Sequence, residues 1–188
     1  MNGRTNIFDL DRFIEDCRDA VRADPSHRAA REVLARANSE PSAILAALGG
    51  PVRAGVTPLY KSDMVTILNV VWGKRMTIMP HDHRMWAVIG VHTGREDNVF
   101  WRRVPDAPGG LIEAAGAKSL GAGCAEPLGR DVIHSVTNPL DRLTAAIHVY
   151  GGDFYGGGRS DWDPENLLER DYDYALHRRM FEEANAAV

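Results

Sequence analysis

The stretch GKRMTIMPHDH, residues 73–83, decides how this chain is interpreted. Side chains alternate between the two faces of a β-strand, so His81 and His83 point to the same face if this stretch is extended. Two imidazoles about 6–7 Å apart along one face can converge on a single metal ion. A third ligand then has to come from another segment.

A second stretch, GAGCAEPLGRDVIHSVTN at residues 121–138, supplies that ligand. Its Gly and Pro residues favour a tight turn between two strands, and His134 follows in a β-rich run. H-x-H alone is a weak pattern, and a single histidine in a strand is more often a packed or surface residue. The two stretches together predict a metal site formed by His81, His83 and His134.

The N-terminal quarter of the chain has a helical pattern. Apolar residues recur at three- and four-residue steps between residues 6 and 49, as on one face of an amphipathic helix. Pro25 ends the first predicted helix, and two more follow at 26–37 and 41–48.

From Val52 onward, short β-rich runs alternate with turn clusters, which is typical of an antiparallel sandwich or barrel. The predicted strands lie at 64–72, 76–79, 86–93, 98–104, 124–129, 131–138 and 143–151, with residues 94–97 (GRED) as a turn. We expect one domain over 1–188, with a helical extension at 1–50, a β-barrel at 52–155 and a C-terminal helix at 165–187.

The overall composition argues against nucleic acid and membranes as partners. The chain has 188 residues, of which 26% are charged, and a formal net charge of −4, so it lacks the basic stripe of a nucleic-acid-binding protein. No apolar run approaches the ~18–20 residues of a membrane span, and the N-terminus lacks the pattern of a signal peptide. Cys17 and Cys124 show no C-x-x-C spacing, which favours free thiols. We expect a soluble cytoplasmic protein that acts on small molecules.

The two histidine stretches resemble the paired motifs of the cupin superfamily, which folds as a double-stranded β-helix, a jelly-roll barrel. There the first motif provides two histidines and usually a glutamate, and the second provides one more histidine. Ala87 and Val88 stand where that glutamate would fall, and Glu96 lies well beyond that window. The resemblance therefore implies three neutral imidazoles without a carboxylate. Such a set leaves open positions on the ion and favours an anionic ligand such as a thiolate.

Three further matches make the resemblance more specific. The segments PHDHRMWAVIGVHTG (80–94), VIHSVTN (132–138) and HVYGGDFYGGGRSDWD (148–163) are similar to cysteine dioxygenase-type thiol dioxygenases, nearer the bacterial members that act on mercaptopropionate or mercaptosuccinate. The resemblance covers about residues 60–175. It implies Fe(2+), that is iron(II), as the cofactor, with a small thiol acid and O2 as the substrates.

In that family a Ser-x-His-x-Tyr unit lies beside the iron. His148 and Tyr150 match it in type and spacing, and Ala146 replaces the serine. Alternation along a strand puts these three residues on one face. A hydrogen bond between the Tyr and the His would fix the phenol and allow proton transfer, so the resemblance implies catalytic roles for both.

The resemblance also suggests a substrate-binding cation. Mammalian-type members bind the substrate carboxylate with an Arg two residues after a Tyr, but residues 60–62 read Tyr-Lys-Ser here, so strict cysteine specificity is not expected. Arg159 lies nine residues after Tyr150, as in the mercaptopropionate-type members, and a guanidinium binds a carboxylate through two parallel hydrogen bonds. Arg75 and Arg84 are rivals for this role.

The predicted activity is the addition of both atoms of O2 to the sulfur of 3-mercaptopropionate, mercaptosuccinate or cysteine, which gives a sulfinate. One alternative is a three-histidine cupin dioxygenase that cleaves carbon–carbon bonds, as in β-diketones. Another is a non-catalytic metal-binding or sensory cupin. The ligand set does not separate iron from nickel or zinc, and the sequence does not indicate an oligomeric state.

Overall fold

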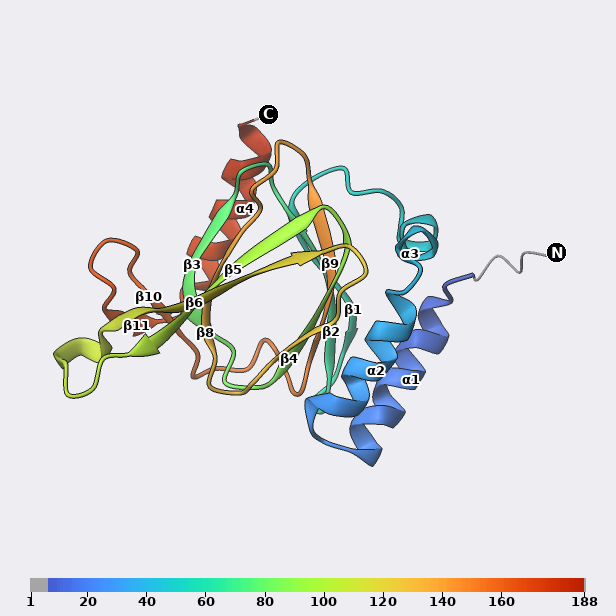
Figure 1. Cartoon of the computed structure of the whole chain (residues 1–188), viewed down its shortest axis with the longest axis horizontal. Helices are drawn as coiled ribbons and strands as arrows, with labels where there is room; N and C mark the ends of the chain where they lie inside the picture. The colour runs from blue at the N-terminus through green and yellow to red at the C-terminus, as the bar shows by residue number, and fades with distance from the viewer. Residues whose placement is uncertain (1–6, 188) are drawn as a thin grey trace.

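The computed structural model describes residues 7–187, which form two facing antiparallel sheets with helices on the outside (Figure 1). The three N-terminal helices are α1 (Leu10–Ala23), α2 (His27–Ala37) and α3 (Pro41–Leu48). They confirm the helices predicted between residues 6 and 49. Residues 1–6 of the predicted extension, and residue 188, lie outside the described part of the chain.

The five-stranded sheet has the order β1-β2-β9-β4-β7, and the six-stranded sheet has the order β11-β10-β3-β8-β5-β6. The strands are β1 (Gly55–Lys61), β2 (Thr66–Trp72), β3 (Thr77–Asp82), β4 (Ala87–Thr93), β5 (Arg95–Arg103), β6 (Ile112–Gly121), β7 (Glu126–Leu128), β8 (Ile133–Thr137), β9 (Thr144–Tyr150), β10 (Ser160–Trp162) and β11 (Glu169–Asp171). The chain crosses repeatedly from one sheet to the other between β2 and β10. This is the double-stranded β-helix, and it confirms the predicted fold class.

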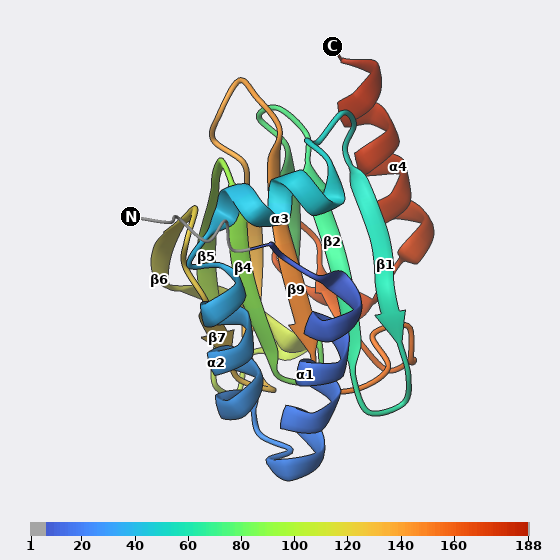
Figure 2. The same ribbon diagram turned by 90° about the vertical axis from the view of Figure 1, so that its right-hand side faces the viewer.

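Strand β9 shows why the five-stranded sheet is apolar on both faces. All of its residues are buried. Ala146 and Tyr150 belong to the cluster inside the barrel, whereas Ile147 and Val149 pack in a second cluster with the N-terminal helices. Helices α1 and α2 cover this outer face (Figure 2) because each buries one apolar stripe against the sheet. The inner face is therefore free to carry a site.

The C-terminal part differs from the prediction. The predicted barrel ended at residue 155, but β10 and β11 extend the six-stranded sheet beyond it. The predicted helix began at residue 165, but α4 (Tyr174–Ala186) begins nine residues later. Leu167, at φ 58°, lies in the turn between β10 and β11, and the Asp173 side chain caps α4 by accepting from the Leu176 N–H at 2.9 Å. The paired Leu167 and Leu168 resembled a helix start, but they close a hairpin.

Within residues 7–187, none of the helices combines the length and apolar character that crossing a bilayer requires.

Candidate metal centre

Two neighbouring strands bring the three predicted histidines together. His81 on β3 pairs directly with His134 on antiparallel β8, and His83 follows the end of β3 on the same face. All three side chains are buried, and one ligand atom from each lies within 4.8 Å of the others. The Nε2 atom of His83 is 3.3 Å from Nε2 of His81 and 3.3 Å from Nε2 of His134.

Outer hydrogen bonds fix which ring nitrogens face inward. The His81 Nδ1–H donates to the Met79 carbonyl at 3.0 Å, and the His134 Nδ1–H donates to Asn98 Oδ1 at 2.7 Å. Both rings therefore turn an unprotonated Nε2 toward the centre. Burial lowers the pKa of His81 and His83 well below the ordinary value, with His134 adding to the effect, and burial lowers the pKa of His134 to about 4.

The unprotonated Nε2 atoms of His81 and His134 both face Nε2 of His83, and such a cluster of nitrogens is stabilised by a proton or a metal ion between them. Nitrogen ligands about 2.0–2.1 Å from one ion stand about 3.0–3.4 Å apart, which matches the spacing seen here. The donor set therefore fits a divalent metal ion that accepts imidazole ligands. Among residues 7–187, no carboxylate joins this group. The assignment of His81, His83 and His134 as metal ligands stays a prediction.

Glu96 is a buried residue that the sequence reasoning missed. The predicted turn at 94–97 is wrong, because only Gly94 bends the chain and β5 already begins at Arg95. The polar run GRED resembles a turn, but the register of β5 buries Glu96 and Asn98 completely. The Asn98 amide donates to Glu96 Oε1 at 3.1 Å, so Glu96 contacts the candidate centre through Asn98 rather than as a ligand.

His148 and Tyr150 lie on β9, in the sheet opposite the three histidines. His148 Nδ1 and the Tyr150 hydroxyl oxygen are 3.0 Å apart, and both residues line the same cavity as the three histidines. The Tyr150 ring stands edge-on to the His83 ring with centroids 5.0 Å apart. Burial raises the pKa of the Tyr150 phenol. The structure therefore brings this pair to the candidate centre, where its catalytic role stays a prediction.

Arg159 lies in the loop before β10 and is only 4% exposed. Its Nε donates to the Asp82 carbonyl at 3.2 Å and its Nη1 to the Phe154 carbonyl at 2.9 Å. The guanidinium is sandwiched between the rings of Phe154 and Tyr172, 4.2 and 3.9 Å from their centroids. Its Nη2 has no hydrogen-bond partner, and within residues 7–187 no carboxylate pairs with it. Phe154 and Tyr172 line the cavity, whereas Arg159 is not among its lining residues.

The rival arginines are already occupied. Arg75 is exposed and pairs with Asp141 at 2.7 Å, and Arg84 pairs with Asp82 at 2.7 Å. A different arginine that the sequence did not single out, Arg178 of α4, lines the cavity but is 75% exposed.

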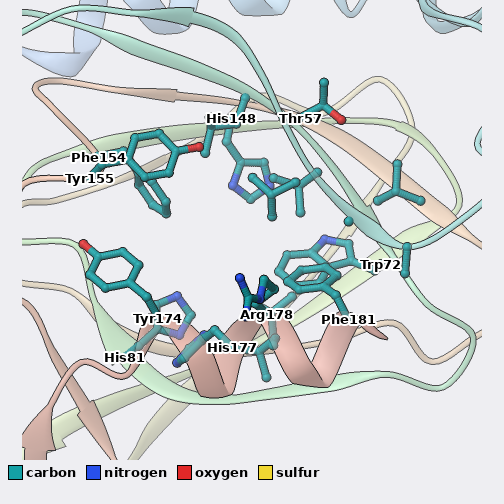
Figure 3. Close-up of a pocket in the computed structure, with 18 of the residues that line it drawn as sticks. Thr57, Trp72, His81, His148, Phe154, Tyr155, Tyr174, His177, Arg178 and Phe181 are labelled. Carbon is teal, nitrogen blue, oxygen red and sulfur yellow. The ribbon is translucent and has the colours of Figure 1, made fainter. Parts of the chain in front are cut away.

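The cavity has a volume of about 520 Å³ and lies between the two sheets and α4. Figure 3 shows His148 and Thr57 on one side, His81 and His177 on the other, Phe154, Tyr155 and Tyr174 at one end, and Trp72 and Phe181 at the other. His177 was not predicted, because α4 is polar and its position over the barrel depends on tertiary packing. Its ring centroid lies 5.7 Å from that of His81, and burial lowers its pKa.

No protein-family model matches the sequence. Solved structures with some similarity include an RmlC-like cupin family protein with a double-stranded β-helix fold from Methanocaldococcus jannaschii (TM-score 0.46, 11% identity, 56% of this chain and 86% of that one). Others are the DMSP lyase DddQ from Ruegeria pomeroyi (0.45, 18%, 60% and 53%) and an oxalate oxidase in complex with glycolate (0.43, 16%, 59% and 56%). None of them bears on activity, so the interpretation of the site rests on the geometry of its histidines.

Proposed function

We propose that this protein is an iron(II)-dependent thiol dioxygenase that converts a small thiol acid to a sulfinate. The observation that carries the proposal is the convergence of three imidazole nitrogens, joined by no carboxylate from residues 7–187, in one cavity with the His148–Tyr150 pair. A neutral ligand set leaves the ion its full charge, which favours an anionic sulfur ligand.

In this proposal His81, His83 and His134 hold the ion by their Nε2 atoms. When bound, iron(II) supplies the redox chemistry that joins O2 to sulfur. The Tyr150 hydroxyl and His148 Nδ1 form a hydrogen-bonded pair at the cavity wall, where the proton of an arriving thiol can be taken up. The aromatic residues Phe154 and Tyr172 limit the access of water to the acid end of the substrate.

Arg159 supports an acid as the substrate. A buried cation without an anionic partner is costly, and contacts with Phe154 and Tyr172 compensate only in part. A substrate carboxylate supplies the missing negative charge once Phe154 or Tyr172, which line the cavity, moves aside to open a path to Nη2. The thiol acids that we propose are 3-mercaptopropionate, mercaptosuccinate and cysteine.

One observation favours a second candidate, the carbon–carbon-cleaving dioxygenase. The cavity of about 520 Å³ falls in the range of general small-molecule sites, roughly 300–1,000 Å³, and a small thiol acid fills only part of it. Apolar residues such as Leu68, Val70 and Ile78 line it beside the histidines. A β-diketone would suit these walls but would leave Arg159 without an anion.

The test is oxygen uptake by the iron-loaded protein with a panel of thiol acids, the matched thiol alcohols and a β-diketone. We expect uptake with thiol acids and, from labelled O2, two labelled oxygen atoms in the sulfinate. The control is the His134→Gln variant, which loses one of the three nitrogens. Uptake with the diketone alone would support the second candidate, and no uptake with any thiol acid would contradict the proposal.

A further inference from the structure

The buried carboxylate of Glu96 connects the two parts of the candidate site: it lies beside His148 of the His148–Tyr150 pair and beside Asn98, the partner of His134. Trp72 Nε1–H donates to Glu96 Oε2 at 2.8 Å, and the Asn98 amide donates to Oε1 at 3.1 Å. Within residues 7–187, its one ionisable partner is His148, whose Nε2 is 3.5 Å from Oε2. Burial opposes ionisation, but the contacts with His148, Asn98 and Trp72 hold the pKa of Glu96 below its ordinary value. Glu96 is therefore a carboxylate at neutral pH, and both of its oxygens can only accept.

An acceptor beside one ring nitrogen of an imidazole favours the proton on that nitrogen, which leaves the other ring nitrogen as a hydrogen-bond acceptor. Within residues 7–187, His148 Nε2 is buried without a hydrogen bond of good geometry, and Glu96 Oε2 lies 3.5 Å from it. A bare Nε2 lone pair there would face the lone pairs of the carboxylate, which is repulsive. When His148 carries a single proton, that proton therefore belongs on Nε2, and Nδ1 accepts from the Tyr150 hydroxyl, 3.0 Å away.

We propose that Glu96 is a positioning residue that keeps the His148 proton on Nε2, so that Tyr150 donates its hydroxyl hydrogen to His148 and presents its oxygen to the cavity as an acceptor. A thiol substrate can donate its S–H hydrogen to this acceptor oxygen. The part of the inference that concerns thiols rests on the proposed function, but the proton position on His148 does not.

The same carboxylate orients the other half of the site through Asn98. Because the Asn98 NH2 group faces an acceptor-only carboxylate, its Oδ1 must face His134 and accept from Nδ1–H at 2.7 Å. That leaves His134 Nε2 bare and directed at the centre. Ala146, two residues before His148 on the same inner face, has no polar side-chain atom, so Glu96 is the group that accepts from His148 in this proposal.

The Glu96→Gln substitution tests this directly because a glutamine amide offers one acceptor where the carboxylate offers two. If its oxygen faces Asn98, its NH2 group faces both His148 and the Trp72 Nε1–H, so it opposes the Trp72 donor and forces the His148 proton onto Nδ1. If its oxygen faces His148, its NH2 group opposes Asn98 and reverses the bond to His134. At least one of the two histidines must change the nitrogen that carries its proton. In zinc-loaded protein, where His134 Nε2 is held by the ion, the glutamine NH2 opposes either the Trp72 donor or the Asn98 donor, and a moved His148 proton identifies the first orientation.

The measurement is ring-nitrogen NMR of the 15N-labelled full-length protein near pH 7.5, metal-free and zinc-loaded, because protonated and bare ring nitrogens resonate far apart. The His148 signal is assigned by its loss in His148→Gln. We expect Nε2–H in the wild type, a moved proton in Glu96→Gln, and Nε2–H again in Glu96→Asp, which keeps the charge. Glu113→Gln, an exposed glutamate paired with Arg102, is the control for loss of one negative charge and should match the wild type.

Turnover adds a second readout. If the proposed activity holds, Glu96→Gln should lower kcat about 100-fold or more with KM changed less than about threefold, since a misplaced imidazole proton disables acid–base chemistry but not binding. A wild-type His148 that carries its proton on Nδ1 would overturn the inference even if Glu96→Gln does not fold. So would a Glu96→Gln protein in which neither proton moves. Failure of every thiol to react, with the tautomers as expected, would overturn only the proposed function.

Discussion

Replacing Arg159 with methionine should raise the KM for a thiol acid by about 10- to 150-fold. The guanidinium has two donors committed to the Asp82 and Phe154 carbonyls, and the buried Nη2 becomes available to a ligand when Phe154 or Tyr172 moves aside. A hydrogen bond to a charged group is worth about 1.5–3 kcal/mol, and each 1.4 kcal/mol is about tenfold in affinity. The fold should change little in stability, because the loss of two hydrogen bonds and the removal of an uncompensated buried charge have opposite effects.

The assay compares oxygen uptake with 3-mercaptopropionate and with the thiol alcohol of the same length. The Arg159→Met effect should appear with the acid and be nearly absent with the alcohol, because only the acid contacts the guanidinium. Arg178→Met is the matched control, since Arg178 lines the cavity but is mostly exposed and lies 3.5 Å from Glu182. Equal losses with acid and alcohol, or a larger loss for Arg178→Met, would refute the assignment of Arg159.

Two further predictions concern Tyr150 and His92. Tyr150→Phe keeps the ring contact with Phe154 (centroids 4.4 Å apart) but removes the hydroxyl. We therefore expect kcat to fall about 100-fold while the metal content stays unchanged. An unaltered kcat would favour a non-catalytic metal-binding protein. Burial, with a smaller effect of His148, lowers the pKa of His92 to about 4. Its stabilising contribution is therefore complete above pH 6.5 and is lost as the pH falls toward 4, so the metal-free protein should lose about 2–3 kcal/mol through this residue between pH 7 and 4.5. Urea unfolding at both values should show that His92→Gln reduces the loss by that amount, and an undiminished loss would contradict the burial argument.

The sequence was sufficient to predict the convergence of the histidines. Alternation on β3 places His81 and His83 on one face, and the turn before β8 brings His134 beside them. The same period of two put His148 and Tyr150 together on the inner face of β9. These residues depend on local geometry within a strand, which a sequence pattern encodes directly.

Features that depend on pairing between distant segments were not visible. Strand β6 is exposed along most of its length and has no apolar alternation, so only its pairing with β5 makes it a strand. Glu96 looked like part of a turn because its burial depends on how β5 pairs with the distant strands β6 and β8. His177 reaches the cavity because α4 packs over the barrel, which nothing in its polar sequence predicts.

The most direct test of the three-imidazole centre is anomalous diffraction from crystals of the full chain loaded with a divalent metal. We expect one peak about 2.0–2.2 Å from the Nε2 atoms of His81, His83 and His134, with no carboxylate oxygen bound. A peak that includes an oxygen of Glu96, or histidines that hold no ion at saturating metal, would contradict this account.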